Sequence, residues 1–332
     1  MAIDITRRNV IAALGTVVAW PSAACARKPE RMRHIGVLMP FSANDQEAQD
    51  RIAAFLQGLR QLGWTEGRDL RMHYRSGTGD ADRNRRNAAE LVALAPDVIL
   101  TTGNETLGPL QGATRIVPIV FVQIVDPVGS GMVASLAHPG GNATGFSTID
   151  YGACGKWLKL LKEIAPDVER VAVFGDHTTS AGFGQSAAIR ALAQSYQVEF
   201  QHINTPDADA IKSAVAKFAR GSNGGLIVTE SWLSIVHRGA IIEVAAQYRL
   251  PTVYPQRFFV TGGGLISYGH DTIDQYHLAA GYVDRILNGE KPADIPVQTP
   301  AKYELVINLK TAKALGRAVP RALHEAADEM IG

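Results

Sequence analysis

Short, continuous runs of β-branched residues alternate with longer amphipathic segments along most of this chain, and the alternation limits the folds open to it. A strand that is apolar on both faces must be covered on both faces, as the strands of a parallel sheet are. Its parallel neighbour is reached only through a crossover segment, usually a helix. The runs that predict such strands are residues 35–39, 97–100, 119–122, 171–174 and 226–228.

Amphipathic helices are predicted between these runs, because apolar residues recur at i, i+3, i+4 and i+7. The alternation of strand and helix occurs before about residue 146 and again up to about residue 254. The chain has 332 residues, too many for one ordinary core. We therefore predict an α/β protein of two doubly wound, parallel-sheet lobes. The helical spacing is found at Ile52, Phe55, Leu56 and Leu59, at Trp157, Leu160, Leu161 and Ile164, and at Ile189, Leu192, Ala193 and Tyr196.

The C-terminal part of the chain is expected to complete these lobes and not to form a third domain. Residues 265–268 and 304–308 are typical of strands. Residues 271–287 are typical of a helix, which the Gly- and Pro-containing segment 288–292 ends. A final helix is expected after the last of these strands.

The first 26 residues have the three parts of a cleavable export signal. Arg7 and Arg8 form the basic start, residues 10–20 are apolar but too few to span a bilayer, and residues 24–26 form a small-residue cleavage site. We expect an exported, periplasmic protein. The paired arginines fit the twin-arginine route, although a general secretory signal has the same parts. Two alternatives remain, a lipid anchor at Cys25, for which Ser22 is a poor match, and a buried first helix.

The charge of the chain argues against two classes of partner. Its formal net charge is +1, and removal of residues 1–26 would leave it neutral. Nucleic acid and anionic membranes both favour proteins with a basic surplus, so we expect neither as the main partner. Cys154 would then be the sole cysteine, most simply a small residue near a helix start, and no intramolecular disulfide is expected.

Polar residues follow the predicted strands of both lobes, at the edge where ligands gather in open α/β sheets. In the first lobe the segments are residues 40–45, 101–105 and 123–126, and in the second they are residues 175–179, 229–232 and 254–256.

Thr102, Gly103 and Asn104 are the predicted seat for a ligand anion. Hydroxyl and amide side chains adjoin a helix start there, where unpaired backbone N–H groups and the positive end of the helix dipole favour a carboxylate. The alternative is that Thr102 and Asn104 only cap the helix.

Asp126 is predicted to pair with a ligand ammonium group, because it follows an apolar strand and precedes Pro127, which fixes the turn. The alternatives are a simple Asp-Pro turn, or a cap on a helix over residues 128–137.

Further contacts are predicted from aromatic and hydroxyl side chains near strand ends. An aromatic ring there can stack on a planar ligand, and a hydroxyl or amide can hydrogen-bond to it. For each residue, packing in a lobe core or ordinary turn chemistry is the alternative. The candidates are Ser42, Asn44, Thr178 with its neighbour Thr179, Trp232, Tyr254 and Tyr268.

Motifs of catalysis and of cofactor binding are missing from the sequence. It has no G-x-G-x-x-G after a strand, no P-loop, no H-E-x-x-H and no G-x-S-x-G elbow. The nine histidines are scattered without metal-ligand spacing. We expect a binding protein without cofactor or metal, and an exported enzyme with its active site in a cleft is the weaker alternative.

Five motifs, taken in order, carry a family resemblance. Together they closely resemble the substrate-binding proteins of ABC transporters, in the family whose better known members take tryptophan-like or tyrosine-like ligands. The motifs are Asp126-Pro-Val-Gly129, LAHPGGNATG at residues 136–145, GGLISYG at 263–269, AGYVDRIL at 280–287 and YELVINLKTAKALG at 303–316.

The resemblance implies the fold of a type I periplasmic binding protein, in which three chain segments join two lobes. The crossings would lie near residues 147–151, 254–257 and 293–300. The first lobe would then comprise residues 33–146 plus 256–292, and the second lobe residues 147–255 plus 293–330.

The resemblance also implies the function of an extracytoplasmic solute-binding component of an ABC importer. Such a receptor would capture a small polar ligand, amino-acid-like or aromatic, and pass it as a monomer to an inner-membrane ABC permease. A periplasmic sensor or accessory protein of the same fold is the alternative. Arg257, near the second expected crossing, could instead neutralise a second carboxylate of the ligand.

Overall fold

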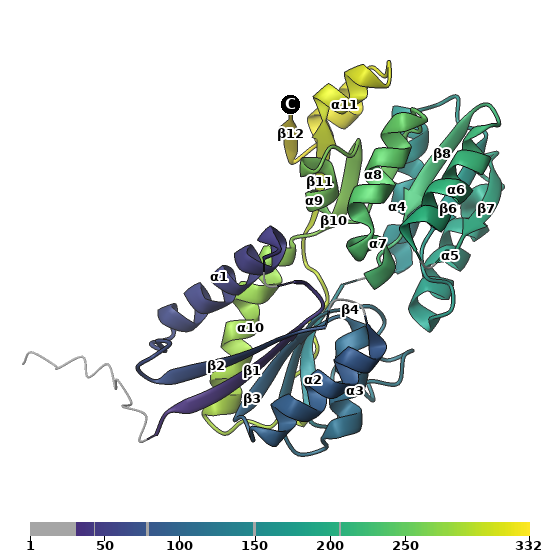
Figure 1. Cartoon of the computed structure of the whole chain (residues 1–332). Coiled ribbons are helices and arrows are strands. Elements are labelled where there is room, and N and C mark those ends of the chain that lie inside the picture. The colour runs from purple at the N-terminus through teal and green to yellow at the C-terminus, as the bar shows by residue number, and fades with distance from the viewer. Residues whose placement is uncertain (1–30, 43, 78–79, 149–150, 206) are drawn as a thin grey trace, which may run out of the picture.

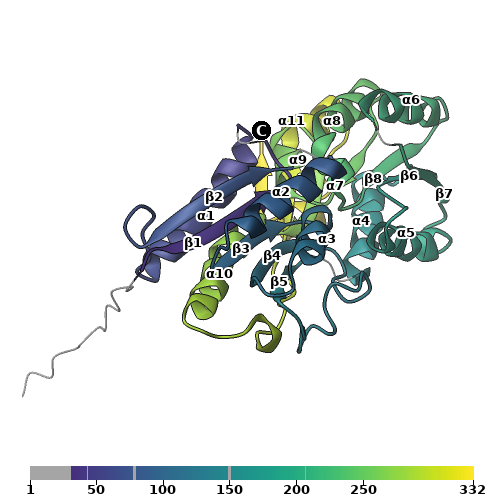
Figure 2. The ribbon, with the colours of Figure 1, turned by 60° about the horizontal axis from the view of Figure 1, so that its bottom comes forward.

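The computed structural model describes residues 31–42, 44–77, 80–148, 151–205 and 207–332, and shows two α/β lobes (Figure 1). The expected export signal, with Cys25, lies outside the described residues. In Figure 2, turned by 60°, the purple-to-blue segments and the yellow-green α10 belong to the first lobe, and the teal-to-green segments belong to the second. The predicted fold class is confirmed.

The first lobe is built on a five-stranded, fully parallel sheet in the order β2-β1-β3-β4-β5. Helices α1 and α10 pack on one face of this sheet, and α2 and α3 cover the other. The elements are β1 (Arg33–Met39), α1 (Gln46–Gln61), β2 (Leu70–Ser76), α2 (Ala81–Ala93), β3 (Val98–Thr102), α3 (Asn104–Ala113), β4 (Ile119–Ile124), β5 (Ala143–Ser147) and α10 (Thr272–Leu287).

The second lobe is built on a seven-stranded sheet in the order β12-β11-β10-β9-β8-β6-β7, in which the β10–β11 pair is antiparallel. Its elements are α4 (Tyr151–Ile164), β6 (Arg170–Phe174), α5 (Ser180–Ala193), β7 (Glu199–Ile203), α6 (Ala208–Ala219), β8 (Gly224–Val228), α7 (Trp232–Val236), α8 (Arg238–Gln247), β9 (Thr252–Tyr254), α9 (Arg257–Thr261), β10 (Ile266–His270), β11 (Tyr303–Asn308), α11 (Leu309–Ala314), α12 (Arg321–Ala326) and β12 (Glu329–Ile331). The 3₁₀ turn η1 (Pro292–Asp294) precedes β11 and lies against β5 of the first lobe.

The burial of the central strands explains why their sequences are continuous apolar runs. Every residue of β3 and β4 is buried, because helices cover both faces of the sheet. Several helices begin where a short polar side chain caps them. Asp45 accepts a hydrogen bond from the backbone N–H of Glu47 at the start of α1, and Asp271 does the same for Ile273 and Asp274 at the start of α10.

The second crossing between lobes differs from the expected position near residues 254–257. β10 pairs with β9 and β11, so α9 and β10 belong to the second lobe and the chain crosses only after His270. The physical reason is that β10 lies between β9 and β11 in the sheet and hydrogen-bonds to both. The chain therefore completes β10 before it leaves the second lobe. The third crossing lies between Gln298, which bridges to Phe146 of β5, and the start of β11.

Within the described ranges, no helix is both long enough and apolar enough to cross a bilayer.

Candidate functional site

The carboxyl ends of the strands in the two lobes face one another and enclose a cavity of about 60 Å³. In the first lobe the lining comes from the loops after β1, β3 and β4, and in the second lobe from the loops after β6 and β8 and from the helices that follow. Five of the six expected strand-end segments therefore meet here, and only residues 254–256 do not contribute. The lining residues are Pro40, Phe41, Thr102, Gly103, Asn104, Glu105, Gln123, Val125, Asp176, Thr179, Ala181, Glu230, Ser231, Trp232 and Ile235.

The first-lobe wall is formed where β3 turns into α3. Gly103 has a φ of +82°, which favours glycine, and a Cβ added to it would lie 2.5 Å from Oε2 of Glu105. Glu105 thus folds back over the start of its own helix. Burial, reinforced by the nearby Asp176 carboxylate, raises the pKa of Glu105 to about 7.

Behind this wall lies a buried pair formed by Arg51 of α1 and Gln123 at the end of β4. Arg51 Nη1 donates to Oε1 of Gln123 over 2.9 Å, and the guanidinium group lies 4.6 Å from the centre of the Phe41 ring. The Gln123 amide nitrogen has no hydrogen-bond partner, although the residue is only 5% exposed. Its backbone φ of +57° is unusual for a residue other than glycine.

The second-lobe wall is formed by the loop between β8 and α7. The Gln185 side chain holds the backbone of Glu230 at both ends, donating to its carbonyl over 2.8 Å and accepting from its N–H over 2.9 Å. Gln256 donates to the Glu230 carboxyl group over 2.7 Å. Burial raises the pKa of Glu230 to about 8, against the lowering effects of Gln256 and Arg51. Ser231 then begins α7 with a capping box to Ser234.

Direct contacts join the lobes around this cavity. Arg238 of α8 forms an ion pair with Asp45 at the start of α1, with 2.7 Å between Nη2 and Oδ2. The Phe41 and Trp232 rings meet edge to face with centroids 6.2 Å apart. Ligand pockets usually measure about 300–1,000 Å³, so a solute the size of an amino acid fits only if the side chains or loops around this cavity rearrange.

The predicted anion seat lines this cavity, but its polar side chains already have protein partners. Thr102 Oγ1 hydrogen-bonds to the Tyr276 hydroxyl. Asn104 donates to the carbonyl of Val125 over 2.9 Å and accepts from its N–H over 3.0 Å. Asn104 thus ties α3 to the end of β4 and does not cap its own helix.

Asp126 does not line the cavity. Its carboxylate accepts from the Gly129 N–H and from the Tyr151 hydroxyl, each over 2.8 Å, so it links the two lobes beside the hinge. The alternative that Asp126 caps a helix is wrong, because residues 128–137 form turns.

The other predicted residues separate into one that lines the cavity and several that do not. Trp232 is part of the lining. Ser42, Asn44 and Thr178 are exposed outside it, although Thr179 lines it and caps α5. The Thr178 hydroxyl donates to Asp176 Oδ1 over 2.6 Å.

Tyr254, Tyr268 and Arg257 also lie outside the cavity. The Tyr254 ring is buried in the second-lobe core, stacked 5.0 Å from Phe259. The Tyr268 ring stacks on Tyr303. Arg257 forms an ion pair with Glu329 over 2.7 Å.

Sequence reasoning did not select Glu105, Gln123 or Glu230 as site residues, although each lies in a segment that it had marked. The available signal was that each is a charged or amide residue directly after a buried strand or its first turn. Within the part of the chain that the structure describes, no group of three or more His, Cys, Asp or Glu side chains could hold a metal ion.

Comparison with known proteins places this architecture in a family. The family model of the ABC transporter substrate binding protein matches residues 35–331. The chain is 25% identical over 261 residues to the tyrosine-binding protein of Clostridioides difficile (strain R20291), covering 79% of this chain and 75% of that protein.

Solved structures share the fold. An ABC domain in complex with L-Trp from Streptococcus pneumoniae has a TM-score of 0.84 at 23% identity, with 91% of this chain and 100% of that one covered. A ligand-free, open substrate binding protein from Clostridium difficile has a TM-score of 0.67 at 21% identity, with 90% and 99% covered. With its family model matched across both lobes, the chain belongs to the ABC transporter substrate-binding proteins, a family of binding proteins and not of enzymes.

Proposed function

We propose that this protein is the extracytoplasmic solute-binding component of an ABC importer, and that it captures a small polar solute in the cavity between its lobes. The observation that carries the proposal is the lining of that cavity, which comes from the strand ends of both lobes. A ligand held there would touch both lobes at once. Its binding energy would therefore favour the closed arrangement over an open one.

Hinged closure supports this function physically. The lobes are joined by three chain crossings and by surface contacts such as the Arg238–Asp45 ion pair, which can open without disturbing either core. The greater likeness in overall shape to the Trp-bound relative than to the open one also fits a closed state. Closure would bury the solute and bring surfaces of both lobes together for the permease.

The class of ligand to test first is an amino-acid-like or aromatic solute. Relatives include a tyrosine-binding protein and a domain solved with L-Trp. In this chain, Phe41 and Trp232 bring aromatic rings from opposite lobes to the cavity, where they can contact an apolar part of a ligand.

We further propose a periplasmic location, reached through the export signal in residues 1–26 by the twin-arginine or the general secretory route. The mature protein would act as a monomer that delivers its ligand to an inner-membrane ABC permease. A lipid anchor at Cys25 is the alternative to release into the periplasm.

A thermal-shift screen of amino acids, amines, aromatic acids and small dicarboxylates tests solute capture. A solute that binds only the folded state raises the melting temperature. The Trp232→Ala variant should weaken binding of that solute, whereas Tyr248→Ala, at the exposed residue that follows α8, should not. Equal affinity in the Trp232 variant would place the ligand elsewhere.

A further inference from the structure

We propose that the cleft selects a solute with net positive charge, an organic ammonium ion that also presents a hydrogen-bond acceptor. This inference rests on the proposed function and narrows it, because it assigns a charge class to the ligand. It departs from the expectation of a ligand carboxylate seated at the start of α3.

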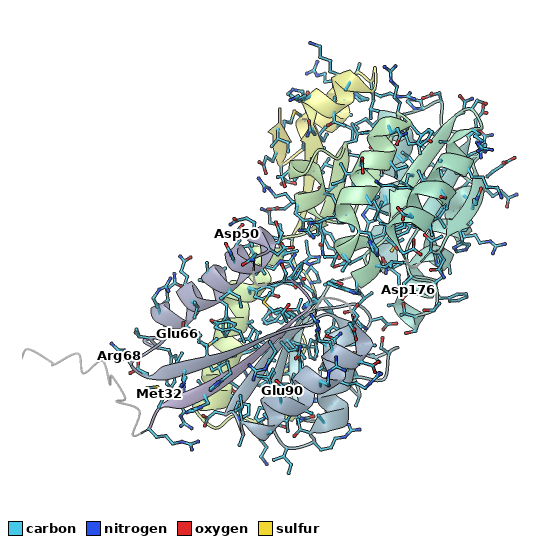
Figure 3. All side chains as sticks on the ribbon, viewed as in Figure 1. Met32, Asp50, Glu66, Arg68, Glu90 and Asp176 are labelled. Atoms are coloured by element: carbon cyan, nitrogen blue, oxygen red, sulfur yellow. The ribbon has the colours of Figure 1, made fainter. Side chains whose placement is uncertain are left out.

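The charge of the lining is one-sided. Glu105 from the first lobe and Asp176 and Glu230 from the second all line the cavity. None of the described lining residues is a Lys, an Arg or a His. Figure 3 shows Asp176 at the edge of the second lobe that is turned toward the first, whereas Glu90 lies in the first lobe, away from that edge. These carboxyl groups, when ionised, would attract a cation between the lobes and repel an anion.

The start of α3 is not open to a ligand carboxylate, since the chain's own Glu105 carboxyl group lies over it. That group is close to Gly103, and the backbone N–H groups of Glu105 itself and of Trp232 in the other lobe lower its pKa against the effect of burial. One donor at the start of α3, the N–H of Glu105, therefore already faces the chain's own carboxyl group.

Gln123 gives an independent indication of a ligand. Its side chain is buried, it lines the cavity, and its oxygen is held by Arg51, which fixes the amide so that the nitrogen is the free end. That nitrogen has no partner, and a buried N–H without an acceptor destabilises the structure because its desolvation is not compensated. A hydroxyl, ether or carbonyl oxygen on the solute would satisfy it. The left-handed backbone of Gln123 is the kind of local strain that collects at ligand sites.

An ammonium group suits this lining better than a metal ion does. The described carboxyl groups are not arranged in a set that could hold a metal. A primary ammonium has three donors that can reach separate acceptors, and charge-assisted hydrogen bonds of this kind are about twice as strong as neutral ones.

Ionisation of the half-buried Glu105 and of the buried Glu230 couples binding to pH. In the ligand-free protein the pKa of Glu105 is raised to about 7 and that of Glu230 to about 8. Asp176 faces Glu105 and strengthens its shift, whereas Arg51 acts on Glu230 and limits it. A bound cation favours the ionised carboxylates, so binding should release protons. Affinity for the cation should therefore rise between about pH 6 and pH 8.

Two matched sets of solutes test the charge class. The first set is tyramine, L-tyrosine and para-hydroxyphenylpropionate. The second set has a four-carbon chain and consists of 4-aminobutanol, 4-aminobutanoic acid and 4-hydroxybutanoate. Within each set the skeleton stays similar while the charge changes from positive through zwitterionic to negative. We expect the amine of at least one set to raise the melting temperature and neither acid to do so.

The outcomes distinguish a failure of the proposed ligand charge from a failure of the proposed solute capture. If an acid or an amino acid stabilises the protein and no amine does, the charge proposal fails while capture in the cleft stands. If no member of either set binds, the charge proposal fails as well, and the broader screen then decides whether the cleft binds solutes at all.

Variants of the cleft carboxyl groups test whether these groups bind the amine. At pH 8, Glu105→Gln and Glu230→Gln should each weaken binding of the stabilising amine by about 30-fold or more and flatten its pH dependence. Glu90→Gln, an exposed carboxylate on α2, should bind as the parent does. Asp176→Asn is a further variant that leaves the buried side chains intact. Calorimetry in two buffers of different ionisation heat measures the proton release. Parental affinity and pH dependence in all three cleft variants would overturn the proposal.

Discussion

The interiors of the two lobes differ sharply from the layer between them. Inside each lobe, the side chains buried against the sheet are apolar, as around Phe55 in the first lobe and Trp157 in the second. Between the lobes lies what we call the interlobe polar layer, whose members are Arg51, Gln123, Glu230, Gln256 and His270, all nearly fully buried. Apolar burial holds each lobe together, whereas polar contacts of this kind are typical of interfaces between domains that move relative to one another.

Buried polar atoms without a hydrogen-bond partner further distinguish the interlobe polar layer from the lobe cores. Within the interlobe polar layer, Arg51 Nε, Gln123 Nε2, Gln256 Oε1 and His270 Nε2 are buried without a hydrogen-bond partner. Each such group destabilises the ligand-free closed state, because closure removes water without supplying a substitute. The polar layer therefore stabilises the structure less per buried side chain than the apolar cores do.

The largest expected loss of stability follows from a substitution in the apolar core of a lobe. Phe55→Ala should lower the free energy of unfolding by about 3–5 kcal/mol, since it leaves a cavity in the first-lobe core. Phe183→Ala, at a side chain that is 67% exposed, should change it by less than about 0.5 kcal/mol. Denaturant unfolding of both variants measures the difference, and similar losses would mean that the core is misplaced.

The second largest loss of stability is expected when a charge is removed from the interlobe polar layer. Arg51→Ala leaves Gln123 without its donor and Glu230 without a nearby positive charge, so we expect a loss of about 2–4 kcal/mol. The pKa of Glu230 should also rise further. Arg60→Ala, in the last turn of the same helix, is the matched control. A stability equal to that of the parent would show that the layer is hydrated rather than closed.

A pH dependence follows from the raised pKa values of Glu105 and Glu230. Between pH 6.5 and about 8, the folded, ligand-free protein holds protons on both carboxyl groups that the unfolded chain has released. Stability should therefore fall as the pH rises through this window, by on the order of 2 kcal/mol. His270, whose pKa burial lowers to about 3, is neutral in the folded protein across this window, and the destabilisation that it causes grows as the pH falls through the unfolded value of 6.5.

Melting temperatures of the parent and of Glu230→Gln across this window measure the effect. The variant should lose most of the decline, and Glu90→Gln should keep it. A parent protein whose stability is constant from pH 6.5 to 8 would contradict the burial of these carboxyl groups.

The smallest expected effect on stability concerns the ion pair across the cleft. Arg238→Ala should cost less than about 1 kcal/mol, because both side chains keep access to water. It should instead shift the protein toward open states. Fluorescence energy transfer between labels on the two lobes would detect that shift, with Lys212→Ala, which removes an ion pair within the second lobe, as the control.

The central strands could be predicted from the sequence because helices bury both of their faces and leave continuous apolar runs. The edge strands could not. In β2 the apolar Leu70 and Met72 alternate with Arg71 and His73, and most of β7 is exposed, so neither strand has such a run. The second crossing was misplaced for a related reason, since the pairing of β10 with β11 joins segments that lie far apart in sequence.

The candidate site was predicted by position better than by residue. The rule that ligands gather at strand ends found segments that meet at the cavity. It could not tell which side chain of a segment faces inward, and so it favoured Tyr254, which packs in a core, over Glu230, which lines the cavity. That choice depends on how the lobes face one another, which local sequence does not specify.

Small-angle scattering of the protein with and without a solute found by the thermal screen tests the central claim most directly. If the solute binds between the lobes and holds them together, the radius of gyration should fall at saturation, toward the value expected for the closed arrangement described above. A radius that stays unchanged while the solute is fully bound would contradict capture by closure of the two lobes.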